Sequence, residues 1–540
     1  MLNRDEAELS RLAARGSTRV TDERDQGEAP LIEALRAYRE RRTAAFHTPG
    51  HKLGAGAPRD LSEALGERLL SADMGIANGL DDTQESGGLL RAAEDLAARA
   101  WGAERAFFVP NGSSGGLQVL VLAAAGPGEK VIVSRNAHKS LLSGLILSGA
   151  WPVFVEPTVD ETWQIAVNVP LERFAAAIAA HPDARAVFVT SPSYNGFCAD
   201  VAGLAAAAHG AGLPLVVDQA WGAHLRFSTA LPVDAMAAGA DAAVISVHKL
   251  LSGLSQASVV LARGERLDGD RLRTMVAMLR TTSPLVPIYL SIDAARRQMV
   301  VGGEALWGEA LRLAALARAR LAAIPGMAVL GADAARQPGS VDFDPVRLTF
   351  SAVEAGLSGY ELEHRLRAEQ AVAIEAADPH NVVVNVTSGD SPASIDRLVA
   401  ACAAVIAVIA AAAAGREPGD DRAPVAVSGA GRTGRRAGDD RGATVASGLT
   451  PGLAPRFGRQ LCSPREAFFG AADALPLAAC VGRVSAEMVV PYPPGIPVLG
   501  PGEEVTAETA AYVAQAAARG LLIHGPRDVS LATLRVVASG

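Results

Sequence analysis

The chain has 540 residues, of which 49% are hydrophobic and only 4% aromatic, and its net charge is −8. This length suits two or three domains, because single hydrophobic cores stop growing at about 250 to 300 residues. The negative charge disfavours non-specific binding to nucleic acid. The four cysteines show no CxxC spacing and predict neither a disulfide framework nor a metal site. These features predict a soluble, Ala-rich globular protein of a reducing cytoplasm.

Residues 1–29 mix charged and small residues and lack the apolar stretch of a signal peptide, so we expect a flexible tail and no secretion. A large domain is predicted over residues 30–301. Its apolar runs KVIVS, WPVFVEP, ARAVFVTSP, LPLVVDQ and DAAVISV alternate with Ala-rich helical segments. Such runs indicate an α/β fold, with a mostly parallel sheet covered on both faces. Ligands of these sheets bind beyond the carboxyl ends of the strands, so the residues after each run are the candidates for a site.

The first candidate follows RAFFVP, where NGSSGGLQVLVLAAA opens an apolar helix at Asn111. The free N–H groups near Gly112, the hydroxyls of Ser113 and Ser114, and the helix dipole would together bind a phosphate. A Ser-Gly turn that only caps a helix is the alternative. The motif is neither a Walker loop nor a GxGxxG fingerprint, which disfavours a nucleotide-binding module.

Two further candidates follow the next strands. His138 comes after KVIVS and carries a ring that could stack on a flat cofactor, although a surface histidine would look the same. Asp218 ends the run LPLVVD, where a buried carboxylate needs a cationic partner such as a protonated pyridine nitrogen. A helix cap or a structural ion pair is the alternative for Asp218.

The last candidate is Lys249, in SVHKLLSGLSQAS, with Ser246 and His248 beside it. The chain has only four lysines among its fifty basic residues, so arginine stands nearly everywhere that a positive charge is needed. A lysine amine can lose its proton and attack a carbonyl carbon, whereas a guanidinium cannot. Lys249 therefore suits a Schiff base with an aldehyde cofactor.

The rest of the chain divides into three parts. A smaller α/β or α+β domain is predicted over residues 302–414. Its last stretch, 398–414, is apolar but short for a membrane span, and its larger side chains recur at helical spacing, which favours a packed helix. Residues 415–448 are rich in Gly and small residues and predict a disordered linker. Residues 449–540 predict a compact C-terminal α+β domain.

A phosphate cradle, a stacking ring, an acidic partner for a ring nitrogen and a Schiff-base lysine occur in this chain order. Together they are the parts needed to hold pyridoxal 5′-phosphate, which serves as an electron sink for amino-acid carbanions. Asp218 would keep the ring nitrogen protonated, and Lys249 would hold the aldehyde.

At this point the sequence resembles the Orn/Lys/Arg decarboxylases, a family of fold-type I pyridoxal-phosphate enzymes, and among them the shorter bacterial arginine decarboxylases. The resemblance is carried by the motifs FHTPGHKLG, VPNGSSGGLQ, TSPSYNG, VVDQAWGAHLRF, SVHKLLSGLSQAS and SAEMVVPYPPGIPVLGPGE, among others. It implies a fold-type I large domain, and it implies α-decarboxylation of arginine, lysine or ornithine to the amine in polyamine-type metabolism. It also implies a homodimer or larger assembly, with no nucleic-acid or membrane partner.

Carried over by residue, the resemblance implies that Lys249 is the Schiff-base lysine, that Asp218 is the partner of the ring nitrogen, and that Lys249 or His248 returns the proton. Around the cofactor it implies Gly112, Ser113, Ser114, His138, Ala220, Trp221, Ser246 and His248. His51 of FHTPGHK and Glu487 of SAEMVVPYPP resemble parts of the family's substrate region. Gln219 and Leu285-Val286 depart from the family pattern, which leaves their surroundings open.

Two other functions stay open at this level. One is another pyridoxal-phosphate reaction on the same scaffold, such as that of an aminotransferase or a carbon–sulfur lyase. The other is a non-catalytic regulatory relative, which the presence of both Lys249 and Asp218 disfavours. No residue in the sequence distinguishes arginine, lysine and ornithine as substrates.

Overall fold

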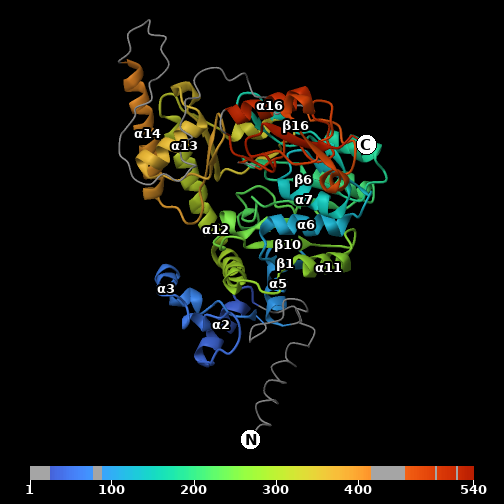
Figure 1. Cartoon of the computed structure of the whole chain (residues 1–540). Helices are drawn as coiled ribbons and strands as arrows, with labels where there is room; N and C mark the ends of the chain where they lie inside the picture. Colours follow the sequence, from blue (N-terminus) through green and yellow to red (C-terminus); the bar gives the residue numbers. More distant parts are fainter. Residues whose placement is uncertain (1–24, 77–87, 415–456, 493–494, 519–520, 540) are drawn as a thin grey trace.

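The structure of this chain is a computed structural model that describes residues 25–76, 88–414, 457–492, 495–518 and 521–539. Residues 1–24 of the predicted tail and all of the predicted linker, 415–448, lie outside the described residues. Figure 1 shows the N-terminal helices at one end of the molecule and the C-terminal part near the other. These N-terminal helices are α2 (Pro30–Glu40), α3 (Arg59–Leu65) and α4 (Glu67–Leu70).

Seven strands form one sheet, here called the large sheet, in the order β1-β10-β9-β8-β6-β2-β3. They are β1 (Arg105–Val109), β2 (Lys130–Ser134), β3 (Trp151–Val155), β6 (Val187–Thr190), β8 (Leu215–Asp218), β9 (Ala242–Ser246) and β10 (Ser258–Ala262). The neighbours from β3 to β9 pair in parallel, whereas β10 is antiparallel to both β9 and β1. The predicted α/β class with a mostly parallel sheet is confirmed, and each of the five apolar runs contains one strand.

Helices cover both faces of the large sheet, and strand β2 shows why. Side chains alternate between the faces of a strand, so Ile132 packs into one core while Val131 and Val133 pack into another. The Ile132 core includes side chains of α8 (Leu171–Ala180) and α9 (Val201–Gly210). The Val131 core includes side chains of α6 (Gly112–Ala124), α7 (Lys139–Ser148) and α11 (Gly269–Leu279). All three valine and isoleucine side chains are fully buried, as a parallel sheet requires.

The helix α12 (Val286–Ala322) leads from the large sheet to a second sheet, here called the small sheet. Its order is β11-β13-β15-β14, with strands β11 (Ala328–Val329), β13 (Arg347–Ser351), β15 (Val382–Asn385) and β14 (Ala376–Ala377). Every neighbouring pair is antiparallel. Of the two arrangements expected for this part of the chain, the small sheet is therefore the α+β one.

Two helices follow the strands of the small sheet, α13 (Gly359–Gln370) and α14 (Pro392–Ala414). Among the described residues, α14 is the one helix long and apolar enough to be a candidate membrane span. Its side chains Val399, Cys402, Val405 and Ile406 are buried in the core that also contains residues of α12 and α13. The helical spacing of these residues thus produces a packed face, as predicted.

The described residues from 457 onward are here called the C-terminal unit. Its elements are α15 (Pro464–Phe469), β16 (Ala472–Pro476), β17 (Val490–Pro491), α16 (Ala507–Ala518), β18 (Ile523–His524) and β19 (Thr533–Val537). β16 pairs with β19, and β17 pairs with β18, both antiparallel. The unit is attached beside β2, because Arg135 directly follows that strand and forms a buried ion pair with Glu503 (3.0 Å).

Candidate active site

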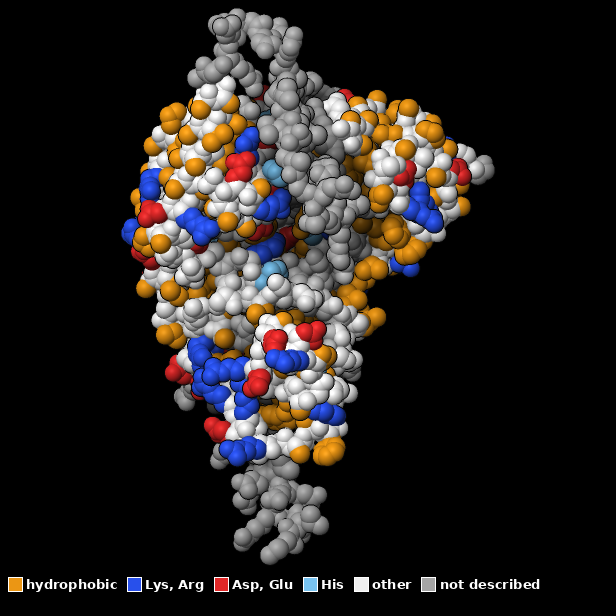
Figure 2. Space-filling view, turned by 60° about the vertical axis from the view of Figure 1, so that its left-hand side comes forward, with side chains coloured by type: hydrophobic (Ala, Val, Ile, Leu, Met, Phe, Trp, Pro, Cys, Tyr) orange, Lys and Arg blue, Asp and Glu red, His pale blue; other side chains and the backbone are white. Residues whose placement is uncertain are grey.

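The carboxyl ends of β2, β6, β8 and β9 meet at a cavity of about 1000 Å³. Most of the predicted site residues line this cavity, although they come from segments far apart in the sequence: Gly112, Ser113, Ser114, His138, Asp218, Ala220, Trp221, His248 and Lys249. Ser246 reaches the same site because its hydroxyl donates to the hydroxyl of Ser113 (2.8 Å). Figure 2 shows histidine and basic side chains gathered near the middle of one face of the molecule.

The start of helix α6 forms one wall of the cavity. Gly112 has a φ of 72°, a left-handed conformation that favours glycine, so the chain can turn sharply from β1 into the helix. The N-cap residue Asn111 makes no side-chain cap hydrogen bond, so the first-turn N–H groups are left uncapped by that side chain. One of them, the N–H of Gly112, donates to the carbonyl of Gln256 (3.1 Å), and the others, with the Ser113 hydroxyl beside them, could hold an anion.

His138 lies at the N-terminus of α7, where its Nδ1 accepts the backbone N–H of Ser140 (3.2 Å). Burial, together with the nearby charges of Lys249 and Lys139, lowers the pKa of His138 to about 4. The imidazole is therefore uncharged at neutral pH. Its ring lies close to Gly495 of the C-terminal unit, because a Cβ added there would be 3.0 Å from ring atoms of His138.

Asp218 is the last residue of β8 and is buried, with only 6% of its surface exposed. Its Oδ1 accepts the backbone N–H of Ala220 (3.1 Å). Burial raises the pKa of Asp218, whereas the charge of Lys249 lowers it. A carboxylate in this position is stabilised by any cation that enters the cavity.

Lys249 lies on the short helix α10 (Val247–Leu250), directly after β9. Its Nζ is 3.9 Å from the centroid of the Trp221 ring. Burial lowers the pKa of Lys249 to about 8, and this lowering is opposed by Asp218 and reinforced by Arg347. About a tenth of the amine is therefore neutral and nucleophilic at pH 7, far more than for an ordinary lysine.

His248, on the same short helix, donates from Nδ1 to the carbonyl of Ala257 (2.8 Å). Because a carbonyl oxygen can only accept, the neutral ring carries its proton on Nδ1 and leaves Nε2 as the basic nitrogen. Burial lowers the pKa of His248.

The structure does not bring His51 and Glu487 to this cavity. His51 lies among the N-terminal helices, with its Nε2 3.1 Å from Oδ2 of Asp73. Glu487 is buried in the C-terminal unit, where its two carboxylate oxygens accept the backbone N–H groups of Arg527 (2.9 Å) and Arg535 (2.8 Å). Glu487 therefore ties the loop at Arg527 to strand β19 of its own unit.

The two departures from the family pattern also lie off the cavity. The Gln219 side chain donates to the carbonyl of Gly222 (3.0 Å) and accepts the N–H of Ala235, which fixes the turn that carries Trp221. Leu285 is the N-cap residue of α12 and is 44% exposed.

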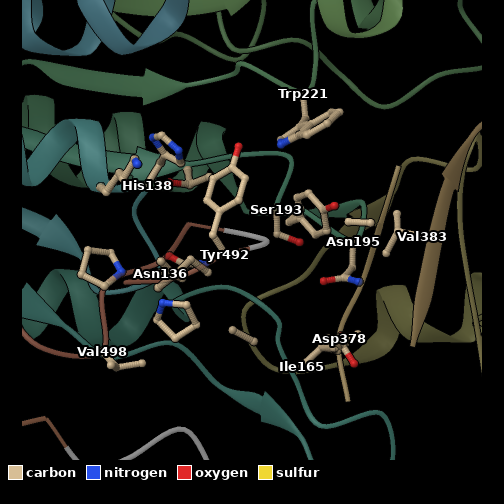
Figure 3. A pocket seen from close by; sticks show the side chains of 18 of the residues that line it. Asn136, His138, Ile165, Ser193, Asn195, Trp221, Asp378, Val383, Tyr492 and Val498 are labelled. Carbon is tan, nitrogen blue, oxygen red and sulfur yellow. The ribbon is translucent and has the colours of Figure 1, made fainter. Parts of the chain in front are cut away.

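Sequence reasoning missed several residues of the cavity. Tyr492 enters it from the C-terminal unit and stacks on His524, with ring centroids 4.9 Å apart. Figure 3 shows its hydroxyl directed to the side where His138 and Trp221 lie. Tyr194 and Asn195 follow β6, so the rule that selected His138 and Asp218 could have found them. No such rule applies to Tyr492, which reaches the site only through the docking of a distant unit.

These residues fit the expected pyridoxal 5′-phosphate. The uncapped helix N-terminus suits its phosphate, the uncharged His138 ring suits a flat neighbour, and the buried Asp218 suits a protonated ring nitrogen. Lys249 supplies an amine that is partly deprotonated at neutral pH.

Comparisons with known proteins show the family and the fold. The family model "Orn/Lys/Arg decarboxylase, major domain" matches residues 29–345, and the model of the C-terminal domain of the same family matches residues 459–519. An arginine decarboxylase of Bacillus subtilis (strain 168) is 35% identical over 512 residues, which are 95% of this chain and 98% of that protein. An arginine decarboxylase of Bacillus anthracis is 33% identical over 517 residues, with 95% and 98% covered. A solved structure of lysine decarboxylase A from Pseudomonas aeruginosa has the same fold, with a TM-score of 0.76 at 24% identity over 99% of this chain and 82% of that one.

Proposed function

Because this chain belongs to the Orn/Lys/Arg decarboxylase family, we propose that it binds pyridoxal 5′-phosphate in the cavity and converts a basic amino acid to its amine and carbon dioxide. The observation that carries this proposal is the meeting of Lys249, Asp218 and His138 with the uncapped start of α6 on one cavity. We take arginine as the first substrate to test, because the relatives at 33% to 35% identity over nearly the whole chain are named arginine decarboxylases.

The phosphate would bind at the N-terminus of α6, held by Ser113 and Ser114, with Ser246 orienting the Ser113 hydroxyl. Lys249 would bind the aldehyde carbon, and Asp218 would bind the ring nitrogen. When bound, the cofactor accepts the electron pair that the departing carbon dioxide leaves on Cα. Trp221 and Tyr492 restrict the access of water to Lys249, because both rings line the cavity.

The side chain of the substrate would bind at the carboxylates of the cavity. Glu375 and Asp378 line it beside the small sheet. The Asn385 amide donates to Glu375 Oε2 (3.0 Å) and so fixes one carboxylate oxygen. The charge of Arg135, which also lines the cavity, is neutralised by Glu503. An acidic wall of this kind favours a substrate with a cationic end and gives a physical reason for a basic amino acid.

The proton that replaces carbon dioxide on Cα must come from a group beside the cofactor. Lys249 and His248 are the candidates from this chain, because both line the cavity and both have pKa values lowered toward or below neutrality by burial. The Nε2 atom of His248 is the nitrogen that can exchange protons, since its Nδ1 is bonded to Ala257.

The test is an assay of carbon dioxide and amine release from arginine, lysine and ornithine by the full-length protein loaded with the cofactor. We expect release from at least one of them, and we expect Lys249→Ala to lose both the release and the visible absorbance of the bound cofactor. Lys130→Ala is the matched control, because Lys130 pairs with Asp183 on the surface (2.9 Å) and should leave both unchanged. The absence of release from all three amino acids, or equal release by Lys249→Ala, would overturn the proposal.

We further propose that the enzyme works in the cytoplasm as a homodimer and that its product enters polyamine-type metabolism. What supports these proposals is the likeness over nearly the whole chain to relatives that are named arginine decarboxylases.

A further inference from the structure

Arg347, the first residue of β13 in the small sheet, is a fully buried guanidinium. Within the described ranges of the chain, no carboxylate lies within ion-pair distance of it. Its Nε donates to the carbonyl of Tyr194 (3.0 Å), and its terminal nitrogens donate to the same carbonyl and to Asn385 Oδ1. Burying a charge without a direct counter-ion costs free energy of folding. An apolar side chain would therefore stabilise the fold better if the role of this residue were purely structural.

The guanidinium of Arg347 contacts the same indole ring as the catalytic amine. Its Cζ is 3.9 Å from the centroid of the Trp221 ring, and Lys249 Nζ is also 3.9 Å from that centroid. Tyr194 meets the Trp221 ring edge-on at 5.4 Å. Arg347 and Tyr194 thus fix the indole that covers Lys249, and Arg347 does so from the other sheet.

Two cations that share one aromatic ring compete for its electron density and repel each other. Since a guanidinium stays protonated, the ammonium form of Lys249 is the one that is disfavoured. The other charged or titratable groups around Lys249 are Asp218 at the end of β8, His138 before α7, His248 on its own helix and Glu375 beside β14. Among them, Asp218 and Glu375 favour the ammonium, so Arg347 is the fixed charge that opposes them.

Arg347 also joins this ring to the acidic wall. Arg347 and Asn385 are register partners in the small sheet, and the Asn385 side chain bonds Arg347 through its oxygen and Glu375 through its nitrogen. The same two hydrogen bonds that orient Asn385 therefore set the positions of both Arg347 and Glu375.

We propose that Arg347 is a positioning residue that acts through Trp221: it holds the indole against Lys249 and disfavours the protonated form of the lysine amine. This inference rests on the proposed function, since it assigns Arg347 a part in preparing Lys249 for the cofactor aldehyde. It concerns a residue of the small sheet that does not itself line the cavity.

The experiment measures the reactivity of Lys249 itself in the full-length protein freed of cofactor. Competitive labelling with acetic anhydride between pH 6 and 10 reports the neutral fraction of each amine, and the other three lysines serve as internal references. In Arg347→Met we expect the Lys249 profile to move to higher pH, because a repelling charge is lost and water gains access. A shift of one pH unit would lower labelling at pH 8 about fivefold.

Two further variants separate positioning from packing. Arg320→Met is the matched control, because Arg320, near the end of α12, pairs with Asp396 of α14 and not with Arg347 or Trp221. It should leave the Lys249 profile in place. Arg347→Lys keeps a cation but loses the planar guanidinium group, so we expect a smaller shift of the Lys249 profile than in Arg347→Met. This variant also tests the inference if Arg347→Met does not fold.

An unchanged Lys249 profile in folded Arg347→Met or Arg347→Lys would overturn the inference, and so would an equal shift in Arg320→Met. These outcomes do not depend on decarboxylation, because the labelling needs no substrate. Failure of the proposed function would instead appear as a wild-type protein without amine release, whatever the labelling shows.

Discussion

The buried ion pair between Arg135 and Glu503 gives the sharpest prediction, because it attaches the C-terminal unit beside the active site. Arg135 Nε and a terminal nitrogen reach the two oxygens of Glu503 at 3.2 and 3.0 Å, and the two side chains are only 3% and 1% exposed. Glu503→Gln keeps the shape of the side chain but leaves the Arg135 guanidinium without its counter-charge. Breaking one partner of a buried pair costs about 3 to 5 kcal/mol.

Undocking can be followed through the backbone amide of Lys139, which donates to the carbonyl of Gly495 across the contact (2.9 Å). If exchange of this amide needs the unit to undock, a loss of about 3 to 5 kcal/mol speeds it by about 10²- to 4 × 10³-fold. Hydrogen exchange with mass spectrometry of the peptide at the start of α7 measures this rate.

Glu504→Gln is the control, since Glu504 makes only a longer ion pair with Arg459 (3.5 Å), whose side chain is 81% exposed. Such a pair contributes about 0 to 1 kcal/mol, so the exchange rate should change by less than about fivefold. The reasoning fails if Glu503→Gln exchanges no faster at Lys139 than Glu504→Gln does.

Two other predictions concern the cavity. Glu375→Gln should lower kcat/KM for a basic amino acid by about 10- to 100-fold, because a hydrogen bond to a charged group contributes about 1.5 to 3 kcal/mol. Steady-state kinetics measures this loss. The prediction is wrong if the control Glu354→Gln, at an exposed position, lowers kcat/KM by as much. His138 has its pKa lowered from 6.5 to about 4 by burial, so the unfolded chain binds more protons between these values and stability falls as the pH falls through that window. In urea unfolding of the cofactor-free protein, His138→Phe should lose less stability than wild type from pH 6.5 to 4.5, and an equal loss would refute the assignment.

The sequence alone determined the α/β class and the strand-end residues that line the cavity. Buried parallel strands need continuous apolar runs, so the sequence predicts the positions of β2, β6, β8 and β9. The carboxyl ends of these strands must then meet at one edge of the sheet. His138, Asp218 and Lys249 were predicted by this rule. Their environment was not, since the lowered pKa of Lys249 depends on burial and on charges from other segments.

Only the tertiary structure decided which residues of the small sheet and the C-terminal unit reach the cavity. Glu487 and Tyr492 lie five residues apart, yet Glu487 bonds its own unit and Tyr492 enters the cavity. Arg347 reaches Trp221 only because the two sheets are packed together by α12 and their connecting segments. Such contacts depend on how distant segments dock, and no local pattern of spacing or hydrophobicity encodes that relation.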